Sequence, residues 1–125
     1  MSGGDQPPDD LEIPDDAIVW RRVVALHYDP ATHLPTTAAF SDSSDKTPMS
    51  GTIAPAGSSV AEYAKRWKVP GVVQFTVGQL RLLGFGVTWI PDDDDPYHVG
   101  IHGPKTPSRK KNLKRTCAWA YEPNR

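Results

Sequence analysis

The sequence predicts a single α+β domain, in which an antiparallel or mixed sheet of about five short strands is covered by two main helices. A length of 125 residues suits one domain, because half of such a chain would be too short to build its own core. Thirteen prolines and ten glycines interrupt the chain often, so its elements must be short. Segments with the alternation typical of strands lie between two segments with helical spacing.

The N-terminal segment differs in composition from the rest of the chain. Residues 1–16 contain no Lys or Arg, and their acidic residues are Asp5, Asp9, Asp10, Glu12, Asp15 and Asp16. The first part of this segment has almost nothing to bury, so chain entropy should leave it unfolded. We therefore expect a disordered acidic tail over residues 1–12 and a single folded domain over residues 13–125.

The first expected element is a strand over residues 17–26, which are rich in β-branched and aromatic side chains. Alternation places Ile18, Trp20 and Arg22 on one face of this strand. Trp20 is one of four tryptophans in the chain, and we assign these large side chains mainly to the core.

Turn-forming residues divide the next part of the chain. Residues 27–35 contain two prolines and are expected to form a loop. Short strands are expected over residues 36–41 and 49–53, because the Asp and Ser side chains of residues 42–46 can build the turn between them. We expect these two strands to pair.

A helix is expected to begin at Val60. Ser59 and Glu62 have the spacing of a capping box, in which each side chain accepts a hydrogen bond from a free backbone N–H at the helix start. The apolar residues recur at helical spacing and form one stripe, Val60, Tyr63, Ala64 and Trp67. Pro70-Gly71 should end the helix.

Three further strands and a short helix are expected in the second half. Residues 72–77, 85–90 and 98–102 read as strands, the last two antiparallel, and a short helix over 77–83 would end at Gly84. The acidic residues 92–95 are expected to form a hydrated loop. The expected sheet therefore combines the regions around Ile18, Ala39, Val73, Val87 and Val99.

A second main helix is expected from Pro107 to about Tyr121. Thr106 can cap it, and proline at the first helical position costs no hydrogen bond. One side would carry the less polar residues Leu113, Cys117, Ala120 and Tyr121. Lys111, Lys114 and Arg115 would point away from that side.

The charge distribution suggests a binding surface at this second helix. The formal net charge is only −1, yet residues 105–115 contain no acidic residue and carry Lys105, Arg109, Lys110, Lys111, Lys114 and Arg115. Free backbone donors and the helix dipole add to the attraction for anions at the helix start. The leading interpretation is a non-catalytic interaction module that binds an acidic protein partner or a phosphate-bearing ligand through these six residues.

Two alternatives remain open. Arg22, His98 and His102, together with Lys105, could converge in the cleft of a small enzyme acting on RNA or a nucleotide, because imidazole titrates near neutral pH. For these histidines, the sequence favours structural roles over catalytic ones. Nucleic-acid binding without chemistry is the second alternative, although a sequence pI of about 6.4 gives no long-range attraction to a polyanion.

No metal or cofactor is expected. In an extended segment, His98 and His102 would lie about 13 Å apart, which is too far for one metal ion. Gly84-Phe85-Gly86 matches no nucleotide-binding fingerprint. The single Cys117 cannot form an internal disulfide, and no segment has the composition of an export signal or a membrane span. We therefore expect a cytoplasmic protein with no membrane partner.

Several blocks of the sequence resemble small bacterial proteins of unassigned function. The blocks are Asp15-Asp16-Ala17 to Trp20-Arg21-Arg22, residues 37–42 and His98 to Gly103 with Lys105. The resemblance would cover most of residues 14–121. It implies a bacterial source and carries over no activity, ligand or catalytic residue.

Overall fold

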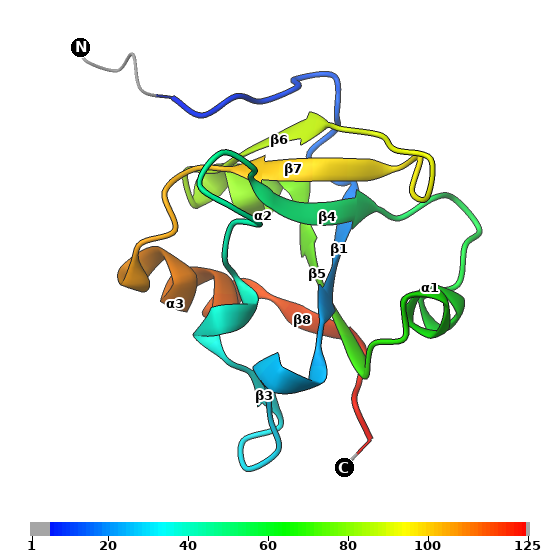
Figure 1. Ribbon diagram of the computed structural model, residues 1–125. Coiled ribbons are helices and arrows are strands. Elements are labelled where there is room, and N and C mark those ends of the chain that lie inside the picture. Colours follow the sequence, from blue (N-terminus) through cyan, green and yellow to red (C-terminus); the bar gives the residue numbers. More distant parts are fainter. Residues whose placement is uncertain (1–5, 125) are drawn as a thin grey trace.

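The computed structural model describes residues 6–124, and in that range the chain forms one α+β domain around an antiparallel sheet (Figure 1). The strands are β1 (Ile18–Val23), β2 (Tyr28–Asp29), β3 (Leu34–Pro35), β4 (Met49–Ile53), β5 (Gly71–Thr76), β6 (Gly86–Trp89), β7 (His98–His102) and β8 (Ala118–Tyr121). The α-helices are α1 (Val60–Trp67), α2 (Val77–Leu82) and α3 (Pro107–Thr116), and two short 3-10 helices are η2 (Ala25–His27) and η3 (Thr37–Ala39).

Six strands pair in the order β6-β7-β4-β1-β5-β8, and β2 and β3 form a separate small sheet. Every strand pair in the described range is antiparallel, so of the two expected arrangements, antiparallel or mixed, the sheet has the antiparallel one. The predicted α+β class and the two main helices are confirmed. The expected pairing of the strands around Val87 and Val99 is also confirmed, with Val87 opposite Ile101.

Different helices cover the two faces of the sheet. On one face, Val19, Phe75 and Val99 belong to the main core, which also includes Leu80 of α2 and Leu113 of α3. On the other face, α1 packs through Ala64 against Trp20 and Val72. None of the helices in residues 6–124 is long and apolar enough to cross a membrane.

The predicted strand over residues 36–41 is wrong, and so is its pairing with β4. Residues Thr37–Ala39 form the 3-10 helix η3, and Phe40 is buried against Phe75 with ring centroids 6.1 Å apart. Strand β4 pairs instead with β1 and β7. Packing of Phe40 in the core therefore outweighs the extended preference of this segment.

The second main helix is shorter than predicted. Helix α3 ends at Thr116, and Cys117 is already extended, with φ −66° and ψ 156°. The following residues form β8, which places Trp119 opposite Val73 on β5. Of the expected stripe, Leu113 is buried in the core, whereas Ala120 packs against the cluster that contains Ala64 of α1, and Tyr121 is exposed. The free edge of β5 explains the change, because it supplies hydrogen bonds that residues 118–121 can use as a strand.

Part of the expected disordered tail is ordered. Residues 1–5 lie outside the described residues, but residues 6–12 have defined contacts along β6, the edge strand of the sheet. Asp9 accepts from the Val87 N–H at 3.0 Å, and Asp10 accepts from the Trp89 N–H at 2.8 Å. Asp10 also donates its N–H to the Val87 carbonyl at 2.8 Å. The acidic segment therefore satisfies polar groups that an uncovered edge would leave free.

Candidate functional site

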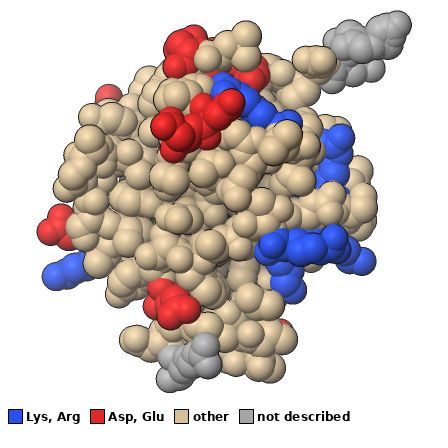
Figure 2. Space-filling model, turned by 180° about the vertical axis from the view of Figure 1, so that it is seen from behind, with Lys and Arg blue, Asp and Glu red and all other residues tan. Residues whose placement is uncertain are grey.

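The basic region predicted from the sequence is held by α3. Thr106 caps this helix by accepting from the Arg109 N–H at 3.3 Å, and Leu113 anchors it in the core. Four cations of α3 form neither an ion pair nor a side-chain hydrogen bond with any residue in the range 6–124, and we call them the α3 patch: Lys110, Lys111, Lys114 and Arg115. Figure 2 shows Lys and Arg side chains gathered on the side that carries α3, apart from most of the acidic side chains on that face.

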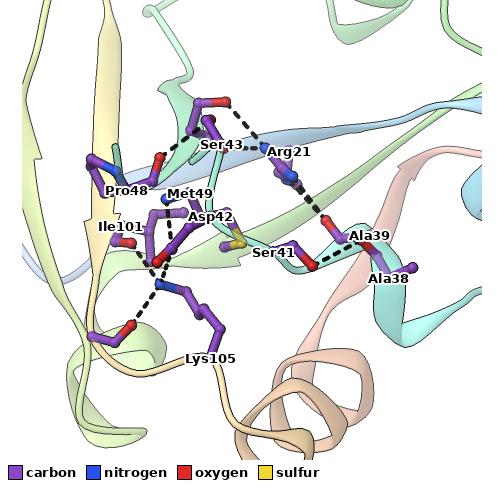
Figure 3. Close-up of polar contacts among 12 residues, drawn as sticks. Arg21, Ala38, Ala39, Ser41, Asp42, Ser43, Pro48, Met49, Ile101 and Lys105 are labelled. Carbon is purple, nitrogen blue, oxygen red and sulfur yellow. Dashed lines mark hydrogen bonds and ion pairs between the residues drawn. The ribbon is translucent and has the colours of Figure 1, made fainter. Parts of the chain in front are cut away.

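Lys105 does not belong to this patch. Its side chain is only 5% exposed, and its ammonium donates to Asp42 at 2.8 Å, to the Ile101 carbonyl at 2.9 Å and to the Gly103 carbonyl at 2.8 Å. Figure 3 shows this ammonium between Asp42 and Ile101. Burial lowers the pKa of Lys105, although the Asp42 carboxylate opposes the shift. All of these bonds are internal, so Lys105 links the loop before β4 to the connection between β7 and α3.

Arg109 is also partly engaged within the domain. Its guanidinium lies over the Phe85 ring, with Cζ 5.4 Å from the ring centroid, and donates weakly to the Leu83 carbonyl at 3.5 Å. Of the six cations predicted to bind a partner, the structure therefore leaves four on α3 without a strong internal contact.

The two arginines of β1 have different surroundings. Arg22, the catalytic candidate, lies over the Trp67 ring with Cζ 4.1 Å from the centroid. Arg21 is the buried one, and it donates to the Ala39 carbonyl at 2.9 Å and to the Ser50 carbonyl at 2.9 Å (Figure 3). Burial, with a smaller contribution from Arg22, lowers the pKa of Arg21 to about 10. Backbone carbonyls thus satisfy this guanidinium, and it needs no bound anion.

The two catalytic candidates on β7 have separate surroundings. His98 donates through Nδ1 to the Ile90 carbonyl at 2.8 Å, and His102 Nε2 lies 2.8 Å from the Thr88 hydroxyl. Burial lowers the pKa of His102, and the charge of Lys105 adds to this effect. No hydrogen bond or ion pair within residues 6–124 joins Arg22, His98 or His102 to another of these three, so their predicted convergence finds no support in the contacts.

A second candidate site was not predicted from the sequence. An open cleft of about 270 Å³ lies beside α1, and we call it the α1 cleft. Its lining comes from β1, β4, residues 55–66 of the loop before α1 and of α1 itself, and the loop before β7: Trp20, Thr52, Pro55, Ser58, Ser59, Glu62, Tyr63, Arg66, Asp95, Pro96 and Tyr97. Because these residues come from four separate segments, no local motif could have identified the cleft.

A short chain of hydrogen bonds forms the polar wall of the α1 cleft. The Thr52 hydroxyl lies 2.5 Å from Asp95 Oδ2 and 2.7 Å from the Tyr63 hydroxyl. The Thr52 hydroxyl donates its single proton to Asp95, so it must accept from the Tyr63 hydroxyl. Burial raises the pKa of Tyr63, which keeps the phenol protonated for this role.

Asp95 lies in a position that the sequence did not predict. It was expected in a hydrated loop, but it is only 6% exposed. Its neighbour Asp92 forms a tight turn by accepting from the N–H groups of Asp94 and Asp95 at 2.9 and 2.7 Å. That turn directs the fourth aspartate of the run, Asp95, inward. Because all four residues of the run are aspartates, the sequence does not indicate which of them is buried.

Comparison with known proteins adds no further assignment to either site. No family model, no curated protein and no solved structure matches this chain. Within residues 6–124, no three His, Cys, Asp or Glu side chains are grouped so that they could hold a metal ion.

Proposed function

We propose that this chain is a non-catalytic interaction module that binds an acidic segment of a protein partner through the α3 patch. The observation that carries this proposal is the gathering of four cations within residues 110–115, none of which forms an ion pair in the described part of the chain. The single Cys117 favours a cytoplasmic setting, where thiols stay reduced.

The surface suits a partner with several carboxylates. A helix of ten residues is about 15 Å long, so the four charges lie close together. Each exposed ion pair contributes only about 0.2–1 kcal/mol, so useful affinity requires several of them at once. The interaction should therefore weaken as salt is added, because exposed charges are screened over about 8 Å at physiological ionic strength.

An acidic protein segment fits better than a nucleic acid or a phosphate ligand. Helix α3 has no aromatic side chain on which a base could stack. The acidic residues of the N-terminal segment and of the loop before β7 would repel the remainder of a long polyanion. Lys105, the cation nearest the predicted phosphate site at the helix start, is already occupied by Asp42.

The proposal is tested by fluorescence anisotropy with two labelled probes of equal charge, an oligoglutamate peptide and single-stranded oligouridylate. The variant Lys111→Glu with Arg115→Glu reverses two exposed charges of the α3 patch. The matched control, Lys46→Glu with Lys65→Glu, reverses two exposed lysines elsewhere. We expect the peptide affinity to fall by about tenfold or more in the first variant and by less than about twofold in the control.

Two results would overturn the proposal. Tighter binding of the oligouridylate through the same residues would identify a nucleic-acid interface instead. Equal losses in the variant and its control would show that the peptide responds only to overall charge. Thermal melting of both double variants confirms that they remain folded.

A further inference from the structure

The α1 cleft combines aromatic walls with carboxylates that have no cationic partner within residues 6–124. We propose that it binds an organic cation, an ammonium or guanidinium group carried on a small apolar body. The ligand would be either a free amine or the side chain of a lysine or arginine in another protein. This site is built by α1, β1, β4 and the loop before β7, so it is separate from the α3 patch.

The hydrogen-bond donors of the Asp95 carboxylate carry no charge. Its hydrogen bonds come from the Thr52 hydroxyl at 2.5 Å and the Tyr97 N–H at 3.1 Å, both of which are neutral donors. A carboxylate removed from water without a cation costs free energy. A ligand cation in the cleft would offset part of that cost, so the site favours positive charge.

The charges around Asp95 also favour a cationic ligand. Glu62 lines the cleft as a second carboxylate, and its side chain is exposed and forms no ion pair in the described part of the chain. The one cation in the lining is Arg66, whose guanidinium donates to the Asp94 carbonyl. The lining therefore carries more negative than positive charge, and the neighbouring Asp93 and Asp94 increase the difference.

The aromatic side chains of the cleft are a further feature that favours a cation. The rings of Trp20 and Tyr63 lie 5.1 Å apart between centroids, tilted by 44°, and Tyr97 is 44% exposed in the lining. Aromatic faces attract cations, most strongly where water is excluded. Pro55 and Pro96 add apolar surface that an uncharged part of the ligand can cover.

The Tyr63 hydroxyl favours a ligand that donates hydrogen bonds. Because its proton is donated to Thr52, the oxygen presents only lone pairs to the cleft. An ammonium or guanidinium can donate to this oxygen, whereas an anionic ligand would find no donor there. A volume of about 270 Å³ lies at the small end of ligand pockets, which suits one amine of amino-acid size or one long side chain.

The test is a calorimetric titration of the full chain with benzylamine, benzyl alcohol and lysine blocked at its α-amino and carboxyl groups. We expect benzylamine to bind about tenfold or more tightly than the neutral alcohol. Binding of blocked lysine at comparable affinity would identify a protein side chain as the natural source, and binding of benzylamine alone would identify a free amine. Amide shifts in an NMR titration should lie in residues that line the cleft.

Two variants assign the binding to named groups. Glu62→Gln keeps the capping contact of α1 and removes one charge, while Tyr63→Phe keeps the ring and removes the acceptor. We expect each to weaken benzylamine binding by about three- to tenfold. Glu12→Gln, the same change at an exposed residue outside the cleft, should leave affinity within about twofold.

Several results would overturn this proposal. They are equal affinity for benzyl alcohol, shifts outside the cleft, unchanged binding in Glu62→Gln, or no heat at millimolar amine. Because the α3 patch is measured with an acidic peptide, failure at one site is distinguishable from failure at the other. Thermal melting of Tyr63→Phe shows whether a loss of binding comes from a loss of folding. If that variant unfolds, Glu62→Gln still tests the proposal, because Glu62 is exposed.

Discussion

The ammonium of Lys105 lies 2.8 Å from the carboxylate of Asp42, and the same carboxylate oxygen accepts from the Met49 N–H at 3.0 Å. One contact therefore joins the loop before β4 to the connection between β7 and α3. A lysine that the sequence suggested for partner binding is instead part of the framework that supports α3.

Lys105→Met should destabilise the domain while leaving partner binding intact. It removes three hydrogen bonds to internal oxygens, and we expect the free energy of unfolding to fall by about 1–3 kcal/mol. Urea denaturation measures this loss, and affinity for the oligoglutamate peptide should change by less than about twofold. Lys111→Met is the matched control, with the opposite pattern expected. A loss of affinity in Lys105→Met without a loss of stability would contradict the structural role.

Arg81 anchors the N-terminal segment to the domain. It donates to Asp9 at 2.9 Å and to Asp15 at 2.7 Å, and these bonds raise its pKa, that to Asp15 most strongly. We expect Arg81→Gln to release residues 6–12 and to speed hydrogen exchange of the Val87 and Trp89 amides by about tenfold. Exchange measured by mass spectrometry or NMR checks this expectation.

Gly86→Ala is an independent test of the same docking that changes no charge. A Cβ at Gly86 would overlap the Pro8 carbonyl, so the segment must move away from β6. We expect faster exchange at the same two amides in this variant. Unchanged protection in both variants would show that residues 6–12 do not cover this edge in solution.

Local sequence signals predicted most of the fold. The cap at Ser59 and the spacing of Val60, Tyr63 and Trp67 located α1, because helix starts and helical stripes depend on nearby residues. Residues 36–41 and 118–121 were misassigned, because each responds to a distant partner. Phe40 is drawn into the core beside Phe75, and Trp119 pairs with β5.

The sites were harder to predict from the sequence than the fold. The run of cations on α3 is visible in the sequence. In contrast, Lys105 pairs with Asp42, which lies 63 positions away in the sequence, and Arg81 pairs with Asp9, which lies 72 positions away. Thr52 and Asp95 are likewise 43 positions apart. Pairings of this kind depend on the sheet order, which no local pattern specifies.

His102 should make stability depend on pH. Its pKa is lowered in the folded state from an ordinary value of 6.5 by burial and then by Lys105, so the unfolded chain binds more protons just below that value. The free energy of unfolding therefore rises with pH through this window and falls as the solution is acidified. We expect His102→Gln, whose amide can still reach Thr88, to flatten the profile measured by urea denaturation. His27→Gln, at a histidine whose side chain forms no hydrogen bond in residues 6–124, should keep the original slope.

Cys117 should be almost unreactive while the domain is folded. Burial raises its pKa to about 11, and its thiol donates to the Lys114 carbonyl at 3.3 Å. The thiolate is the reactive species, so reaction with Ellman's reagent at about pH 8 should be roughly a hundredfold slower than for an ordinary thiol. It is the only cysteine in the sequence, so the absorbance reports one site. Unfolding in urea should restore a fast reaction, whereas rapid labelling of the folded chain would mean that the end of α3 opens and that Cys117 is not held in the core.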